Sequence, residues 1–310
     1  MAINTEISKK FEGSLPGRSL IRGSKKIYLP GFRGLSLYDV WKPFIGQLRK
    51  TSLVERASGI SFNVVMALPP ILLSVFTLIP LLPISKEFIH QLFALIKDIV
   101  PGEKNNSVII KFLDDFIHRP RTGLLSFGLL TAIYFSSNAM MGILRSFDKN
   151  YPGFRTRKGF HKRKTALQLT LIVFALVMLC LVLLIAQSAV LKWIGIKGVT
   201  LRTFIHNFRW IVIVLLMFLS ISNIYRHGPA LAKRWPLLTA GSVFATSLMI
   251  IAIAIVSYWV NHFSNYNKLY GSIGAIFILF SLIYANSLAI LMGFELNVTL
   301  DNLSGQKKEV

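Results

Sequence analysis

Apolar residues run along the chain in long blocks that more polar segments separate. Six blocks are long enough to cross a membrane as helices, which takes about 20 residues each. They lie at about 58–82, 122–144, 166–191, 208–225, 237–260 and 271–297. Each block is apolar around its whole circumference, whereas a helix of a soluble protein has one apolar face. The pattern predicts an all-α, polytopic membrane protein with six transmembrane helices.

The charged residues lie mostly between these blocks. The chain of 310 residues is 53% hydrophobic, with 35 Lys and Arg against 13 Asp and Glu. When the connecting segments are assigned alternately to the two sides, most basic residues fall on the side of both termini. Such basic segments mark the cytoplasmic side of a membrane. We therefore expect a multi-pass protein of a bacterial inner membrane with both termini in the cytoplasm.

The region before the first block has two parts. Residues 1–35 are basic, contain glycine and show no periodic apolar face, so we expect a mobile cytoplasmic segment. Residues 36–57 carry apolar side chains at helical spacing. Two interpretations stay open for this amphipathic helix: it lies at the membrane interface, or it packs on the bundle. Residues 58–300 would form the membrane domain and residues 301–310 a cytoplasmic tail.

Two connecting segments have recognisable character. Residues 84–119 read as two short amphipathic helices, which would form a cap on the external side. The segment 145–164 is strongly basic, and we expect it to contact anionic lipid headgroups on the cytoplasmic side. It is too short for a nucleic-acid-binding surface, so we expect no nucleic acid partner.

Several spans contain residues that are costly in hydrocarbon. Pro69 and Pro70 remove two backbone donors from the middle of the first span, which predicts a kink or break of the helix. Asn63, Asn138 and Asn223 lie inside three different spans. Each amide needs a partner in the bundle or a polar cavity.

The last span has two distinct faces. Small residues recur every fourth position and predict a strip against which another helix packs closely. The strip consists of Ser281, Ala285, Ala289 and Gly293, with Asn297 at its inner end. Glu295 lies about 200° around the helix from Gly293, at about 100° per residue, so it faces a second neighbour or a cavity. We therefore expect this helix to be central.

Glu295 is the residue that most needs an explanation. An unpaired carboxylate at this depth costs several kcal/mol, about 2.5 or more on insertion scales. Arg56 and Arg145 lie at a similar depth and are the partners that we expect. Glu295 could connect helices, or it could serve a substrate or ion pathway.

The motifs of common enzymes are absent from the sequence. The six histidines are dispersed, and none forms HxxxH or HExxH with another. No phosphate loop, dinucleotide fingerprint or serine-hydrolase elbow is present. We expect no metal, no cofactor and no enzymatic activity, including ribonuclease activity.

Three stretches together are similar to those of a known family. ERASGISFNVVMALPPILLSVFTLIP, SSNAMMGILRSFDKNY and YGSIGAIFILFSLIYANSLAILMGFELN, in this order and spacing, resemble the YihY/virulence factor BrkB family of bacterial inner-membrane proteins, formerly labelled ribonuclease BN. The resemblance covers residues 40 to 300. It implies six spans with cytoplasmic termini and a link to envelope integrity. The matching residues with a possible role are Glu55, Arg56, Asn63, Pro69, Pro70, Asn138, Arg145, Gly271, Gly293, Glu295 and Asn297.

These observations favour a transporter or lipid-handling protein that does not use ATP. A broken first helix, the three asparagines and the Glu295 region would line a polar cavity near the cytoplasmic side. The alternative is a scaffold protein that binds a partner protein of the envelope and transports nothing. The sequence leaves the substrate and the oligomeric state open.

Overall fold

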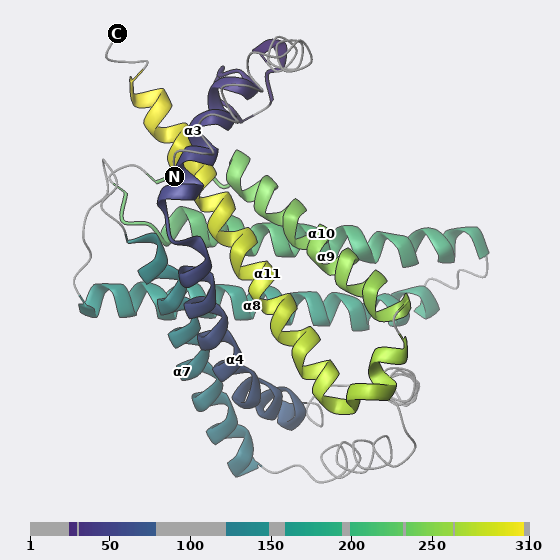
Figure 1. Ribbon diagram of the computed structural model, residues 1–310. Coiled ribbons are helices and arrows are strands. Elements are labelled where there is room, and N and C mark those ends of the chain that lie inside the picture. Colours follow the sequence, from purple (N-terminus) through teal and green to yellow (C-terminus); the bar gives the residue numbers. More distant parts are fainter. Residues whose placement is uncertain are drawn as a thin grey trace.

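The structure is a computed structural model and describes residues 25–29, 31–78, 122–148, 159–193, 199–231, 234–262 and 264–306. These residues form helices and connecting turns, without a β-strand among them. The helices, shown in Figure 1, are α3 (Leu37–Lys50), α4 (Leu53–Leu78), α7 (Thr122–Phe147), α8 (Gly159–Trp193), α9 (Val199–His227), α10 (Ala240–His262) and α11 (Ser264–Gln306).

Six of these helices are long and apolar enough to cross a membrane. The candidate spans are Leu53–Ser74, Ser126–Phe147, Gly159–Cys180, Trp210–His227, Ala240–Trp259 and Ile276–Gly305. The prediction of an all-α protein with six spans is therefore confirmed, although the ends of the spans differ from those expected. The chain is a multi-pass membrane protein.

Helices α4 and α7 pair along their length in antiparallel orientation. A Cβ atom on Gly142 of α7 would lie 3.1 Å from the Asn63 side chain of α4. Fourteen residues earlier, a Cβ on Gly128 would lie 3.4 Å from Leu73. Glycine at these two points allows the helices to approach closely, which is how helices associate in a membrane.

Helix α11 lies between α10 on one side and α4 on the other, and Figure 1 shows it crossing the middle of the molecule. The central position predicted for the last span is thus confirmed. Helices α8 and α9 run side by side and are steeply inclined to α4 and α7 (Figure 1).

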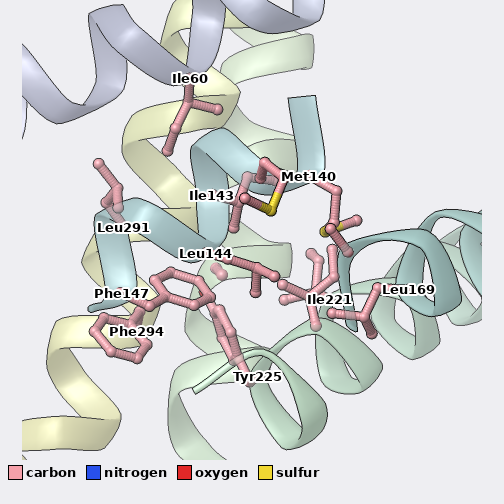
Figure 2. Close-up of a cluster of buried hydrophobic side chains, with 14 of the residues drawn as sticks. Ile60, Met140, Ile143, Leu144, Phe147, Leu169, Ile221, Tyr225, Leu291 and Phe294 are labelled. Carbon is pink, nitrogen blue, oxygen red and sulfur yellow. The ribbon is translucent and has the colours of Figure 1, made fainter. Parts of the chain in front are cut away.

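The helices meet at one end of the bundle, which we call the convergent end. Here the early turns of α4, α8 and α10 pack against the last turns of α7 and α9 and against residues 291–298 of α11. Figure 2 shows the buried side chains at this end, with the Phe147 and Phe294 rings beside Tyr225. The two phenylalanine rings stack with centroids 4.0 Å apart and an 11° interplanar angle. The main core of the described residues is therefore at one end of the spans.

Helix α3 packs on the convergent end. Ser36 is the N-cap of the helix, and its Oγ accepts a hydrogen bond from the Asp39 backbone N–H. Val40 and Phe44 are fully buried and pack against Leu296 and Leu300 of α11. This packing agrees with one of the two interpretations left open for residues 36–57. The helix ends at Lys50, and the first spanning helix already begins at Leu53.

Residues 31–35 form a turn that joins this packing. Gly31 and Gly34 have positive φ angles, which glycine adopts without strain. The turn inserts Phe32 into the cluster of Val40, Phe44 and Leu300. Arg33 pairs with Asp301 at 2.8 Å. In the segment that we expect to be mobile, Phe32 and Leu35 thus pack against the bundle.

Of the kink or break predicted at Pro69 and Pro70, the structure has the kink and no break. Helix α4 continues through Pro69 and Pro70 without interruption. Proline has a helix-compatible φ, and a helix in a membrane tolerates the lost hydrogen bonds by a local adjustment. The result is a bend, and Figure 1 shows the last part of α4 turning away from the direction of its first part.

Other expectations concern parts of the chain that lie outside the described residues. These include the external helices at 84–119, residues 1–24 and the end of the tail after Gln306. Within the described part, the expected tail is helical as far as Gln306.

Candidate functional site

Glu295 lies in the middle of the convergent end and forms a buried ion pair. Its side chain is 0% exposed, and its Oε1 accepts a hydrogen bond from Arg56 Nη1 at 2.6 Å. The Arg56 side chain is 8% exposed. The pairing of Glu295 with Arg56 is the one that their similar depth predicts.

Two further groups complete this arrangement. Gln47 of α3 donates its Nε2 hydrogen to Glu295 Oε2 at 3.3 Å. Arg56 also donates, through Nη2, to the carbonyl oxygen of Ser146. We call Gln47, Arg56, Glu295 and the Ser146 carbonyl the Glu295 cluster. It joins α3, α4, α7 and α11.

The Ser146 carbonyl is one of the last in α7, where carbonyl groups have no partner within the helix. A cation at the end of a helix also interacts favourably with the helix dipole. Arg56 thus neutralises a carboxylate and satisfies a helix end with the same guanidinium. Removing either charged side chain would leave the other buried without its partner, which costs about 3–5 kcal/mol.

Arg145 does not belong to this cluster, and the expectation that it pairs with Glu295 is wrong. Its side chain is exposed. Arg56 reaches α7 through the backbone oxygen of Ser146, which points along the helix axis at the end of α7.

Asn297 caps the start of α10. Its Oδ1 accepts a hydrogen bond from the Gly241 N–H at 2.9 Å, and its Nδ2 donates to Thr239 Oγ1 at 3.0 Å. The first N–H groups of a helix have no partner within the helix. A side chain of α11 therefore supplies a hydrogen bond that α10 cannot make itself.

The strip of small residues on α11 packs against α10, as the sequence predicts, at its inner end. A Cβ added to Gly293 would lie 2.4 Å from the Gly241 carbonyl oxygen, and one added to Gly241 would lie 2.1 Å from that of Gly293. Any side chain larger than hydrogen would push the helices apart. Ala289 is buried and Ala285 is half-buried, whereas Ser281 is exposed. The close contact therefore does not extend along the whole strip.

Tyr225 connects α9 to α11 at the convergent end. The residue is fully buried, and its hydroxyl donates to the Ile290 carbonyl of α11 at 2.6 Å. Its ring lies 6.0 Å from the ring of Phe147. A buried tyrosine needs such a partner for its hydroxyl.

Asn138 has a charged partner. Arg163 of α8 donates to Asn138 Oδ1 at 2.5 Å, and its guanidinium lies 5.2 Å from the centre of the Tyr134 ring. This contact joins α7 and α8 on the flank of α7 that carries the exposed Tyr134. It is separate from the Glu295 cluster.

Asn63 and Asn223 each donate a hydrogen bond from the side-chain amide to a carbonyl of their own helix. Asn63 Nδ2 donates to the Gly59 carbonyl at 2.7 Å, and Asn223 Nδ2 donates to the Leu219 carbonyl at 2.9 Å. Asn63 also lies against Gly142. The predicted asparagines are therefore distributed over the bundle and do not gather at one site.

A cavity of about 320 Å³ lies between α4, α7 and α8. Residues of α4 that line it are Val64, Ala67, Ile71 and Ser74, and residues of α7 include Ala132, Ser136, Ala139 and Ile143. Helix α8 contributes Thr170, Phe174 and Val177, and α9 contributes Ile224. Its walls are mostly apolar, with the hydroxyl residues Ser74, Ser136 and Thr170 among them, and we call it the apolar cavity.

This cavity differs from the polar one that we expect from the sequence. Neither Glu295 nor any of the asparagines at positions 63, 138 and 223 lines it. Each of these polar groups instead has a partner within the bundle, as described above. Asn297, also expected at the polar cavity, lines a smaller pocket of about 170 Å³ with Arg33 and Thr239. A polar side chain in a membrane helix therefore need not face a cavity.

Metal chemistry receives no added support from the described residues. Among them, no three His, Cys, Asp or Glu side chains lie close enough together to hold a metal ion.

Sequence reasoning missed several residues of the convergent end. Gln47 is a polar residue of an amphipathic helix and gives no signal of the carboxylate that it contacts. Gly241 gives a weak signal, because it lies among small residues at the start of the fifth span, opposite the small strip of the sixth. The apolar cavity gives no signal, since its lining is indistinguishable from lipid-facing sequence.

Comparisons with known proteins agree on one family. A sequence profile of the virulence factor BrkB family matches residues 44–309. The ribonuclease-like protein YfkH of Bacillus subtilis is 26% identical over 250 residues, which are 79% of this chain and 89% of that protein.

A second relative is the UPF0761 membrane protein RSc1559 of Ralstonia nicotianae. It is 25% identical over 277 residues, which are 88% of this chain but only 60% of that longer protein. No solved structure matches the chain.

Proposed function

Because the chain belongs to the virulence factor BrkB family of multi-pass membrane proteins, we propose that it handles lipid in a bacterial inner membrane without using ATP. In this proposal the apolar cavity receives an acyl chain of a bilayer lipid. The convergent end faces the cytoplasm, together with both termini. The carbonyl and charge contacts of the Glu295 cluster keep that end closed while the cavity exchanges its contents with the bilayer.

The observation that carries the proposal is the apolar cavity itself. It lies among helices that cross the membrane, so the molecules that surround it are lipids. Its volume of about 320 Å³ falls at the lower end of the range for small-ligand sites, roughly 300 to 1,000 Å³. Val177 lines it and is 49% exposed, so the lining is continuous with the outer surface of α8. An acyl chain can therefore enter from the side.

Anionic headgroups at the convergent end would be a second lipid contact. Exposed or half-exposed basic residues at that end include Arg49, Lys50, Arg145 and Lys164. Each basic side chain near an anionic surface contributes about 1 kcal/mol of attraction. Trp41 of α3 is 48% exposed beside them and suits a membrane interface.

The test is whether a side chain that fills the cavity displaces lipid. In Val177→Trp the indole would enter the cavity. Leu179→Trp is the matched control, because Leu179 is on the same helix, is 46% exposed and does not line the cavity. Native mass spectrometry of protein purified from phosphatidylethanolamine/phosphatidylglycerol vesicles should find bound lipid in the wild type and in Leu179→Trp, and much less in Val177→Trp. Equal lipid in all three proteins would contradict the proposal.

A scaffold function is the alternative, and the buried Glu295 cluster favours it. The carboxylate has no exposed surface, which suits a connection between helices rather than a substrate pathway. A scaffold would hold a partner protein of the envelope and would release no lipid. Affinity purification after cross-linking in cells should then recover one partner in fixed ratio, with the same recovery from Val177→Trp.

A further inference from the structure

Ser74 differs from the other hydroxyl residues of its helix. Ser61 and Thr77 donate to carbonyls one turn earlier in α4, at 2.6 Å and 2.9 Å. Ser74 is 2% exposed, and its Oγ has no hydrogen-bond partner among the described residues. It also lines the apolar cavity. A buried hydroxyl without a partner costs roughly 1–3 kcal/mol, and a bound group that accepts its hydrogen would remove that cost.

The opposite end of the cavity is closed and apolar. Val64 is the lining residue of α4 that lies closest to the convergent end. Ile143 and Ile224 line the same end, are 7% and 6% exposed, and belong to the main core. A lipid headgroup or ester cannot be placed against these side chains without losing its hydrogen bonds. Thr170 also lines the cavity, but its hydroxyl already donates to the Ala166 carbonyl at 2.8 Å. The polar part of a bound lipid is therefore placed at the Ser74 end.

The length of the cavity fits one chain. Val64 and Ser74 are ten residues apart on α4, which is about 15 Å along the bent helix axis at 1.5 Å per residue. The hydrocarbon core of a bilayer is about 30 Å thick, so the distance corresponds to about half of it. Ser74 is the last residue of the candidate span in α4, at the side of the membrane away from α3.

We infer that the apolar cavity binds an acyl-ester lipid, with the chain end toward the convergent end and an ester carbonyl accepting a hydrogen bond from Ser74 Oγ. The lipid then comes from the leaflet farther from α3. This inference rests on the proposed function and adds the chemical class of the ligand and its direction.

The ester contact can be tested with two lipids that differ only there. Vesicles would contain equal amounts of diacyl and dialkyl phosphatidylglycerol of the same chain length, because the ether lipid lacks the carbonyl. Native mass spectrometry should find the ester lipid retained about fivefold over the ether lipid by the wild type, as one hydrogen bond of about 1 kcal/mol predicts. In Ser74→Ala the two lipids should be retained equally.

Ser58→Ala is the matched control, because the Ser58 hydroxyl lies on the same helix and donates to the Val54 carbonyl at 2.9 Å. This variant should keep the fivefold preference. Equal retention by the wild type, or a preference that persists in Ser74→Ala, would overturn the ester contact. If Val177→Trp still displaced both lipids in that case, the proposed function would stand; if the wild type retained neither lipid, both would fail.

The direction can be tested with a photoreactive phosphatidylcholine that carries a diazirine on its chain. Vesicles captured through an affinity tag at the N-terminus present α3 outward. With the probe in the inner leaflet, irradiation should label peptides of α4, α7 and α8 that line the cavity. With the probe in the outer leaflet, this labelling should be lost. Labelling that is equal from both leaflets, or stronger from the outer one, would overturn the direction while leaving the cavity as a lipid site.

Discussion

The Glu295 cluster and the apolar cavity share two helices, α4 and α7, but differ in what they bury. At the convergent end, charged and amide groups are buried and each charge has a partner at hydrogen-bonding distance. Along the following turns of α4 the walls of the cavity are mostly apolar and leave a space of about 320 Å³. In a membrane, burial from lipid supplies little driving force, so tight packing and hydrogen bonds hold helices together. The comparison indicates that the convergent end supplies cohesion and that the cavity is free to exchange its contents.

The largest effect should come from breaking the Glu295 cluster. Glu295→Ala leaves Arg56 buried without its carboxylate, so we expect a loss of about 3–5 kcal/mol in unfolding free energy. Unfolding in mixed detergent micelles with increasing dodecyl sulfate would measure it. Glu55→Ala is the control, because Glu55 is exposed in the first turn of α4 and should change the free energy by less than about 0.5 kcal/mol.

The double variant Arg56→Met/Glu295→Leu sharpens this result. Replacing a buried ion pair by apolar side chains of similar volume is often neutral or stabilising. We expect it to recover most of the stability that Glu295→Ala loses and to retain lipid as the wild type does. Recovered stability with lost lipid retention would instead give the pair a role in the lipid pathway.

The contact between α10 and α11 should be the next most sensitive point. In Gly293→Ala the new methyl group would meet the Gly241 carbonyl oxygen at 2.4 Å, so the helices must separate. Such overpacking costs about 1–3 kcal/mol. The thermal midpoint of the purified protein should fall, whereas Gly59→Ala should leave it unchanged or raise it, because nothing lies within 4 Å of that position.

A smaller loss is expected when α10 loses its cap. Asn297→Ala removes the acceptor of the Gly241 N–H, and the loss of a helix cap costs about 0.5–2 kcal/mol. Hydrogen exchange followed by mass spectrometry should become faster in the first turn of α10. Asn302→Ala, on the same helix beyond this contact, should leave the exchange of α10 unchanged; faster exchange there would contradict a local capping role.

The smallest effect is expected for Asn223, which the sequence places at a polar cavity and the structure does not. Asn223 donates to a carbonyl of its own helix, so Asn223→Ala should change the unfolding free energy by less than about 0.5 kcal/mol. Lipid retention should also stay at the wild-type level. If the Asn223→Ala variant folded normally but lost its bound lipid, Asn223 would belong to the lipid-binding site.

The parts of this molecule that sequence reasoning predicted are those where the membrane leaves few choices. A carboxylate at the depth of Glu295 needs a cation, and Arg56 was available at that depth. A strip of small residues needs a closely packed neighbouring helix, and Gly293 has one at Gly241 of α10. By contrast, Arg145 lies at the end of its helix with an exposed side chain, and Asn63 donates to the Gly59 carbonyl of its own helix. Pro69 and Pro70 bend α4 without breaking it, since neighbouring groups absorb the lost bonds. The cavity depends on how three helices cross, which apolar periodicity does not determine.

The separation of Arg56 and Glu295 along the chain sets an order for biogenesis. The two residues are 239 positions apart. At about 5–20 residues per second, the ribosome makes the carboxylate roughly 10 to 50 seconds after the guanidinium. During that interval the first span carries a cation without its final partner, and the bundle cannot close. Insertion of the last span therefore completes assembly. A chain that stops before residue 295 would leave Arg56 of the first span without its carboxylate, and quality-control proteases could recognise it.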